Sequence, residues 1–231
     1  MAAFPVSDTT QKILKNFAGI SNSVLLLEGQ RQKTVLQSKA VFALAEFPEA
    51  WPKEVGIYDL GMFLGNLSLF EKPTLDFKDD AFVITHADRS SLSIRYRYSD
   101  PTTIMSIGDK TFPKDNPAVE FTLSAYALSQ AKKAAAQNKL ETISVTVKDG
   151  SVVLTATDPK NSSSHAFAMS IPKSEVTAHD AKYARVIPFK VEHLGLLLDG
   201  DYTVALSGWK YAYITNKAVP VSYYVVEQTK D

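Results

Sequence analysis

The feature of this sequence that most constrains its fold is an order of predicted elements that occurs twice. Each half reads as a helix, a set of strands, a second helix and a further set of strands. The string His193-Leu194-Gly195-Leu196-Leu197 in the second half echoes Phe63-Leu64-Gly65-Asn66-Leu67 in the first. Strands adjacent in sequence favour antiparallel pairing, so the pattern predicts an α+β fold of two similar units with helices gathered on one face. A single all-β barrel with stray helices is the alternative, and it accounts poorly for the repeated order.

A polar stretch of about residues 99–117 separates the two halves, and it contains three of the eleven prolines together with Gly108. We expect this stretch to connect two domains, residues 1–110 and 111–231. In a chain of 231 residues, each domain is large enough to bury a core without disulfides or metals.

Four helices are predicted from the spacing of apolar residues, over about residues 9–19, 58–70, 122–138 and 189–198. Ser7 or Asp8 is the expected N-cap of the first helix, and Pro188 stands where the fourth could begin. The strongest hairpin signal is Asp149-Gly150, which lies between two alternating β-branched runs.

Composition and motifs exclude several classes of protein. The chain has no Cys, and its four histidines lack metal-ligand spacing, so we expect no metal site. Nucleophile-elbow, dinucleotide-binding and Walker-type motifs are missing, which predicts no catalytic residues and no cofactor. Trp51 and Trp209 could be ligand platforms, although packing at loop edges is the favoured interpretation. The apolar runs are too short to span a bilayer, and the start of the chain lacks a secretion signal, so a cytoplasmic protein is expected.

Charge argues against a conventional basic nucleic-acid binder, because 25 Lys and Arg residues balance 25 Asp and Glu residues. Balanced totals still allow the two signs to be segregated on different surfaces. Lys12 and Lys15 lie one turn apart on the polar side of the first helix, and Lys132 and Lys133 share a stripe of the Ala-rich third helix. Lys139 follows just past the end of that helix.

Several short strings occur in an order that a known family shares: Asp8-Thr9-Thr10, Leu14-Lys15-Asn16-Phe17-Ala18, Ile57-Tyr58-Asp59-Leu60, Phe63-Leu64-Gly65 and Leu67-Ser68-Leu69. In this order and spacing they resemble the sliding clamp of T4-type bacteriophages. The resemblance is concentrated in the first 70 residues and in the hairpin around Gly150. It implies two similar clamp-type domains of antiparallel sheet with two helices each, which form a closed ring as a homotrimer.

The resemblance also implies a function. The chain would be a DNA sliding clamp that encircles duplex DNA without sequence specificity and tethers the replicative DNA polymerase, giving processivity without enzymatic activity. An ATP-driven clamp loader and late-transcription factors would be further partners, in the cytoplasm of the infected bacterial host. The alternatives are a phage structural or tail-associated β-rich assembly protein, and a small-ligand barrel or hydrolase.

Three sets of site residues follow from the resemblance. Lys12, Lys15, Lys132, Lys133 and Lys139 would face the DNA, whereas a solvated helix face is the other interpretation of these lysines. Clamp subunits pair edge to edge through strands, here the strands at 91–98 and 164–171, with candidate interface residues Ile94, Tyr96, Tyr98, His165 and Phe167. The connector would form an apolar pocket for a short C-terminal peptide of a partner, lined by Ile104, Met105, Ile107 and Phe112. The other interpretation of these four residues is that they clip the connector onto the domain interface.

Overall fold

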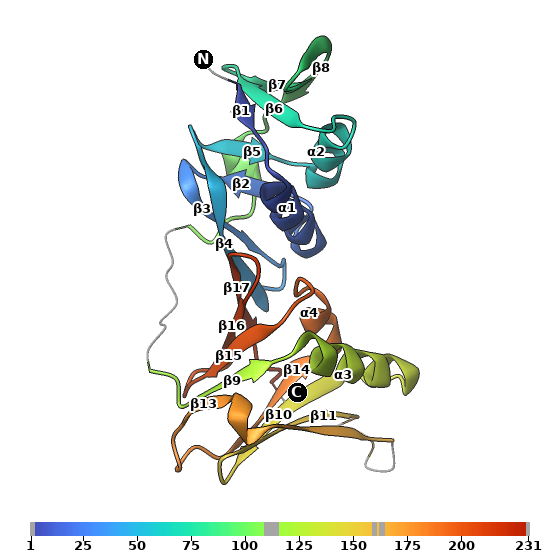
Figure 1. Cartoon of the computed structure of the whole chain (residues 1–231), viewed down its shortest axis with the longest axis vertical. Coiled ribbons are helices and arrows are strands. Elements are labelled where there is room, and N and C mark those ends of the chain that lie inside the picture. Colours follow the sequence, from blue (N-terminus) through green and yellow to red (C-terminus); the bar gives the residue numbers. More distant parts are fainter. Residues whose placement is uncertain (1–2, 109–115, 159–160, 162–164, 230–231) are drawn as a thin grey trace. The chain divides into compact units, whose positions relative to one another are not determined.

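The computed structural model describes residues 3–108, 116–158, 161 and 165–229, and the chain separates into two compact units, Met1–Lys110 and Thr111–Asp231 (Figure 1). Each unit combines antiparallel strands with helices, which confirms the α+β class. Within the described part of the chain, none of the helices combines the length and the apolar character that crossing a bilayer requires.

Over residues 3–108, the first unit contains two α-helices and three sets of paired strands. Its elements are β1 (Phe4–Pro5), α1 (Asp8–Ile20), β2 (Val24–Leu26), β3 (Gly29–Val35), β4 (Val41–Trp51), β5 (Val55–Ile57), α2 (Leu60–Leu67), β6 (Pro73–Phe77), β7 (Ala81–His86) and β8 (Arg89–Arg97). The strands pair as a sheet in the order β1-β6-β7-β8, as the hairpin β3-β4 and as the pair β2-β5. A short 3-10 turn at Pro101–Thr103 follows β8.

In the part of the second unit that the structure describes, there are two α-helices and two sets of strands. Its elements are β9 (Val119–Leu123), α3 (Ala125–Gln137), β10 (Thr142–Lys148), β11 (Ser151–Thr157), β12 (Phe167–Ile171), a 3-10 turn (Lys173–Glu175), β13 (Val176–His179), β14 (Arg185–Lys190), α4 (Val191–Gly195), β15 (Tyr202–Leu206), β16 (Tyr211–Asn216) and β17 (Val221–Val226). One sheet has the order β12-β11-β10-β14, and β13-β9-β15-β16-β17 lie in sequence in the other.

Local signals account for α1. The Ser7 side chain accepts a hydrogen bond from Thr10 N, so Ser7 is the N-cap, one of the two residues predicted. Ile13, Leu14 and Phe17 are fully buried on one face of this helix. The helix ends at Ile20, one residue beyond the predicted range.

The Asp149-Gly150 hairpin is also confirmed. Lys148 pairs with Ser151 across the turn, and Asp149 and Gly150 have φ angles of 50° and 74°. Positive φ at both central residues is the geometry of a two-residue turn whose twist matches that of the flanking strands.

The other three helices are shorter than predicted. In α2 the helix begins only after the N-cap Asp59 and ends at Leu67. The predicted third helix began at residue 122, but Thr122 belongs to β9, where it pairs with Thr203. The fourth shrinks to α4, because Pro188 does not start a helix but pairs with Ser144 inside β14.

Aromatic side chains fill the core of the first unit. The Trp51 ring is 1% exposed and lies with its centroid 5.3 Å from Phe4, 5.7 Å from Phe77 and 6.0 Å from Phe82. Trp51 is therefore a core residue and not a ligand platform. The second unit has its own core, in which Phe121, Leu154 and Phe189 are almost completely buried.

Candidate DNA-facing helices and subunit edges

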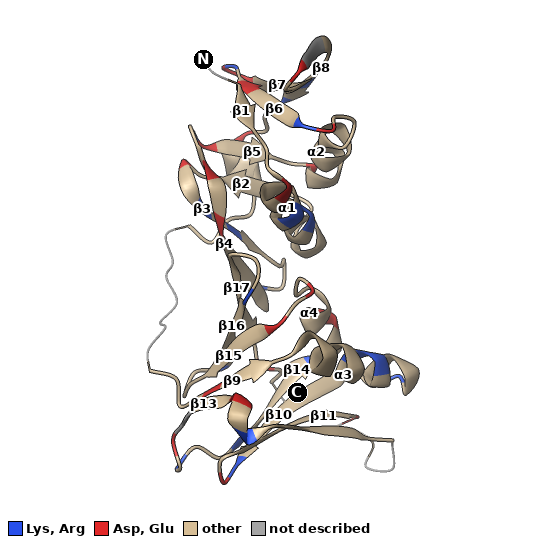
Figure 2. Cartoon of the chain, viewed as in Figure 1, with Lys and Arg blue, Asp and Glu red and all other residues tan. Residues whose placement is uncertain are grey.

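The polar face of α1 carries two exposed lysines. Lys12 and Lys15 lie on the solvent side of the helix, away from the buried Ile13, Leu14 and Phe17 (Figure 2). The apolar face fixes which side of α1 is covered, so the two cations are left free to meet an anionic partner.

The second cationic helix is α3. Basic residues colour part of this helix in Figure 2. Lys133 is exposed, whereas Lys132 is half-buried, so the two lysines are not equivalent. Lys139 is exposed just beyond the helix. The opposite face is made of small residues that bring α3 close to β10, β11 and β12: Ala127, Ala131 and Ala135.

The remaining helices differ in charge. No Lys or Arg occurs in α2, whose Met62 side chain is 59% exposed. At the start of α4, Lys190 lies 3.3 Å from the Glu192 carboxylate, which offsets its charge. His193 of α4 is buried, and burial lowers the pKa of its imidazole. Among the helices that the structure describes, exposed lysines without an ion-pair partner on the same helix are therefore concentrated on α1 and α3.

Each four-stranded sheet has one edge blocked by proline and one edge without it. Pro5 lies in the edge strand β1 and Pro188 in the edge strand β14, where Pro188 O also accepts a hydrogen bond from Gln228 N. A proline cannot donate to a neighbouring strand, so it discourages further pairing at that edge. The opposite edges, β8 and β12, contain no proline. These are the two strands in which the interface residues were predicted.

The side chains of β8 divide between the core and the surface. Tyr96 is buried, its hydroxyl donates to Asp59 O at 2.9 Å, and its ring lies 5.2 Å from Phe63. Burial, with the nearby Asp59 carboxylate, raises its pKa. The alternation of β8 turns the Tyr96 side chain toward the core, so its predicted place in a subunit interface would rest on its backbone at the β8 edge. Ile94, on the same side of the strand, is half-buried.

Tyr98 lies immediately after β8. Its ring contacts Phe82 with centroids 4.7 Å apart, and its hydroxyl donates to Lys78 O. Burial, followed by the charge of Asp80, raises the pKa of Tyr98 to about 12. The outward residues Arg95 and Arg97 both contact the Asp80 carboxylate, at 2.5 and 2.8 Å. These exposed charges flank the open β8 edge.

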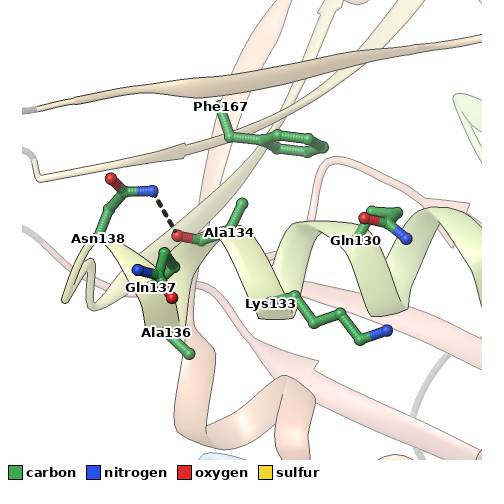
Figure 3. A pocket seen from close by; sticks show the side chains of 7 residues that line it. All are labelled: Gln130, Lys133, Ala134, Ala136, Gln137, Asn138 and Phe167. Carbon is green, nitrogen blue, oxygen red and sulfur yellow. Dashed lines mark hydrogen bonds between the residues drawn. The ribbon is translucent and has the colours of Figure 1, made fainter.

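The β12 edge begins later than predicted. The strand starts at Phe167, so the exposed His165 precedes it, while Ser164 lies outside the described residues. The half-buried Phe167 ring lies over the C-terminal half of α3 and lines an open hollow of about 720 Å³ (Figure 3). The other lining residues come from the helix and its end: Gln130, Lys133, Ala134, Ala136, Gln137 and Asn138. The open strand thus adjoins a partly apolar depression.

The connector residues do not form one surface. Ile104 is only 6% exposed, and a Cβ added to Gly56 would meet its side chain at 3.4 Å, so Ile104 packs into the first unit. Met105 is 42% exposed and Ile107 is half-buried, whereas Phe112 lies outside the described residues. Lys33 Nζ donates to Gly108 O, which ties this end of the connector to β3. Ile104 is therefore a core residue of the first unit and is not available to a partner peptide.

An exposed aromatic surface lies at the start of β16. Trp209 is 51% exposed and stacks on Tyr211 with centroids 6.5 Å apart and planes 10° apart. Tyr224 of β17 contacts Tyr211 at 5.4 Å. The sequence carried a signal for this surface, because Trp209, Tyr211 and Tyr213 alternate along one strand face.

Metal-binding clusters of His, Asp and Glu are missing from the residues that the structure describes. His86, for example, accepts a hydrogen bond at Nδ1 from Asp88 N, which is a local turn contact.

Comparison with known proteins identifies the family. Residues 120–226 match the family model described as "gp45 sliding clamp, C terminal". The sliding clamp of Vibrio phage KVP40 is 31% identical over 205 residues, which cover 87% of this chain and 89% of that protein. The sliding clamp of Escherichia phage RB69 is 27% identical over 214 residues, covering 88% of this chain and 87% of the relative.

Solved structures share the fold at much lower identity. The PCNA of A. fulgidus, solved with the C-terminal region of FEN-1, superimposes with a TM-score of 0.76 at 12% identity and full coverage of both chains. The Proliferating Cellular Nuclear Antigen of Entamoeba histolytica gives a TM-score of 0.73 at 14% identity, covering 98% of each chain. The resemblance noted in the sequence is therefore confirmed along almost the whole chain. This chain belongs to the sliding-clamp family of T4-type bacteriophages, and it is a DNA sliding clamp without enzymatic activity.

Proposed function

We propose that three copies of the chain close into a ring around duplex DNA, with the lysines of α1 and α3 facing the phosphates. The observation that carries this proposal is the pair of unlike open edges, β8 in one unit and β12 in the other. Pairing β8 of one copy with β12 of the next is a head-to-tail contact, and such contacts generate a ring when the rotation closes. The family relation favours three copies.

The DNA contact is electrostatic and independent of sequence. Lys12, Lys15, Lys132, Lys133 and Lys139 give five cations in each copy, and about fifteen in a ring of three. Phosphate contacts position a protein without reading bases, which suits a ring that must slide. A chain of zero net charge can make this contact when its acidic residues lie on surfaces away from the DNA.

The ring would tether the replicative DNA polymerase by holding it near the DNA, which raises its effective concentration at the primer end. A short C-terminal peptide is the proposed tether, because the A. fulgidus PCNA was solved with the C-terminal region of FEN-1. We place its site at the connector, where Met105 and Ile107 reach solvent beside the buried Ile104. The Trp209–Tyr211 surface is the second candidate, since it exposes a stacked aromatic pair.

The family relation also suggests an ATP-driven clamp loader and late-transcription factors as partners, in the cytoplasm of the infected bacterial host. A ring that closes through strand edges needs help to open around circular DNA, which is the physical reason to expect a loader.

The test of the ring is its mass in solution. Sedimentation equilibrium of the 25.4 kDa chain should give a particle of three copies. The same preparation should sediment with linear duplex DNA, whose free ends let a closed ring thread on, at low salt and separate from it as salt rises. A stable monomer at high concentration would contradict the ring, and a salt-independent association would contradict the lysine contacts.

A further inference from the structure

The N-terminus of α1 is held by a carboxylate from a strand far away in sequence. Ser7 N donates to Glu49 Oε1 at 2.9 Å, and Thr10 Oγ1 donates to Glu49 Oε2. Glu49 lies near the end of β4 and is separated from these partners by 42 and 39 residues. One side chain therefore ties both the cap and the first turn of the helix to the strand on which the helix packs (Figure 1).

These two bonds give the start of α1 a directional restraint on its rotation about its own axis. The packing of Ile13, Leu14 and Phe17 holds the apolar face against the core, and the hydrophobic effect that drives this packing is itself not directional. At 3.6 residues per turn, Lys12 and Lys15 lie about 200° and about 140° around the axis from Thr10. Both lysines thus project away from the Glu49 contact, and any rotation that breaks it moves both of them together.

The other lysine-bearing helix is held in the same way. Asp201 Oδ1 accepts a hydrogen bond from Ala125 N at 2.7 Å, across 76 residues, at the start of α3. All three longer helices have a local cap: Ser7 at α1, Ser124 at α3 and Asp59 at α2. At the lysine-free α2 the carboxylate is this local cap, because Asp59 is only three residues from Met62. At α4 the residues that the structure describes provide no side-chain cap. Long-range carboxylates thus accompany the two helices that carry lysine pairs.

We propose that Glu49 is a positioning residue for DNA contact: its carboxylate fixes the axial rotation of α1 and thereby directs Lys12 and Lys15 toward the phosphates. This inference rests on the proposed function and deepens it. Two other roles must be distinguished from it. Glu49 could contribute stability alone, or its negative charge could act on the phosphates directly, and that charge would weaken DNA association.

Two substitutions separate these roles. Glu49→Ala removes both bonds and the charge, whereas Glu49→Gln removes only the charge, because the Gln oxygen can accept from Ser7 N while its amide donates to Thr10 Oγ1. Association with linear duplex DNA, onto which a closed ring can thread over a free end, is measured over a series of salt concentrations, with assembly followed by sedimentation. We expect Glu49→Ala to weaken association and to make the fall of log K with log salt less steep. Glu49→Gln should keep the affinity and the steepness of the unchanged chain.

The double variant Lys12→Ala/Lys15→Ala sets the expected size of the effect. It should reduce the magnitude of the slope by about 0.9 for each phosphate that is no longer neutralised. Glu49→Ala should reproduce much of that loss, and it should cause no further loss when added to the double lysine variant. The matched control is Asp59→Ala, which removes the carboxylate cap of α2. This control should lower the melting temperature and leave the salt slope unchanged.

Each contrary result is informative. If Glu49→Ala and Glu49→Gln both strengthen association, the charge acts directly and positioning is overturned. If Glu49→Ala lowers the melting temperature but not the slope, or acts equally in the double lysine variant, the role is stability alone. If the double lysine variant itself changes nothing, the proposed DNA contact of α1 fails first, and the inference fails with it. Should Glu49→Ala not assemble, Thr10→Val removes one of the two bonds while keeping the buried shape, and it should lower the slope partially.

Discussion

Asn138 and Ala134 are joined twice at the C-terminal end of α3. The backbone N and the side-chain Nδ2 of Asn138 both donate to Ala134 O, at 3.1 and 2.9 Å (Figure 3). The helix stops there, and the next residue, Lys139, has a φ of 54°. Glycine is the residue that normally occupies this left-handed position after a helix.

Replacing Lys139 should therefore change stability and DNA contact in opposite directions. Lys139→Gly should raise the free energy of unfolding by about 0.5–1 kcal/mol, because a side chain is disfavoured at this φ. The same variant should associate more weakly with linear duplex DNA. Lys39→Gly is the control, since Lys39 has a φ of 58° in the turn after β3 and is not among the DNA-facing lysines. Urea unfolding and sedimentation with linear DNA check both variants, and unchanged association by Lys139→Gly would remove Lys139 from the contact.

Lys133 should carry more of the DNA contact than its neighbour. Lys133→Glu is expected to reduce the magnitude of the slope of log K against log salt by at least about 0.9 for each phosphate that Lys133 neutralises. Lys132→Glu should reduce it by less, because Lys132 is half-buried. The fold should be unaffected by the first change, as checked by circular dichroism. Lys72→Ala, which removes an exposed lysine paired with Asp88, should leave the slope unchanged. If all these variants have the slope of the unchanged chain, Lys132 and Lys133 only form a solvated helix face and do not contact DNA.

The β12 edge should determine assembly. Phe167→Asp is expected to convert the trimer to a 25.4 kDa monomer, because it introduces a charge beside the open strand and into the hollow next to α3. Val186→Asp is the matched control, since Val186 is 62% exposed on β14, the proline-bearing edge of the same sheet. Sedimentation velocity distinguishes the two. A trimer that survives Phe167→Asp, or one that dissociates equally with Val186→Asp, would contradict the assignment of the edge.

The connector site can be tested with a fluorescent peptide copied from the C-terminus of the polymerase. Met105→Ser and Ile107→Ser should each weaken its binding about tenfold, the effect expected when one apolar side chain no longer contributes its burial. Trp209→Ser is measured in parallel, with assembly checked for all three. If only Trp209→Ser weakens binding, the peptide site lies on the aromatic surface of β16.

Tyr202 makes the second unit sensitive to alkaline pH. Burial raises its pKa to about 12, above the ordinary value of 10.0. The folded state therefore keeps a proton that the unfolded state loses, so the stabilising contribution is complete below pH 10 and is lost as pH rises toward 12. The loss should reach about 2–3 kcal/mol. Tyr202→Phe should show a shallower fall in the free energy of unfolding over this range, and an equally steep fall would show that other groups are responsible.

Local sequence determined the parts of this protein whose signals lie within a few residues. The Ser7 cap and the apolar face of α1 fall within one helix, and the Asp149-Gly150 turn needs only its two flanking strands. Lys12, Lys15 and Lys133 could be placed on exposed helix faces for the same reason, because helical periodicity separates them from the buried residues. The order of elements, which occurs twice, indicated two similar α+β units, whereas short strings such as Ile57-Tyr58-Asp59-Leu60 carried the resemblance to the family.

Tertiary structure decided what depends on residues far apart in the chain. Pro188 lies in a strand and not at a helix start because Ser144 pairs with it. Tyr96 turns inward because its ring packs on Phe63 and its hydroxyl donates to Asp59 O. Glu49 gave no sequence signal, since its partners Ser7 and Thr10 lie about forty residues away. Short-range preferences fix whether a segment is helical, but the free energy of burial and of long-range hydrogen bonds is defined only once the segments have met. For this reason the sequence predicted that the lysines lie on exposed helix faces, whereas the contact of Glu49 with α1 became visible only in the tertiary structure.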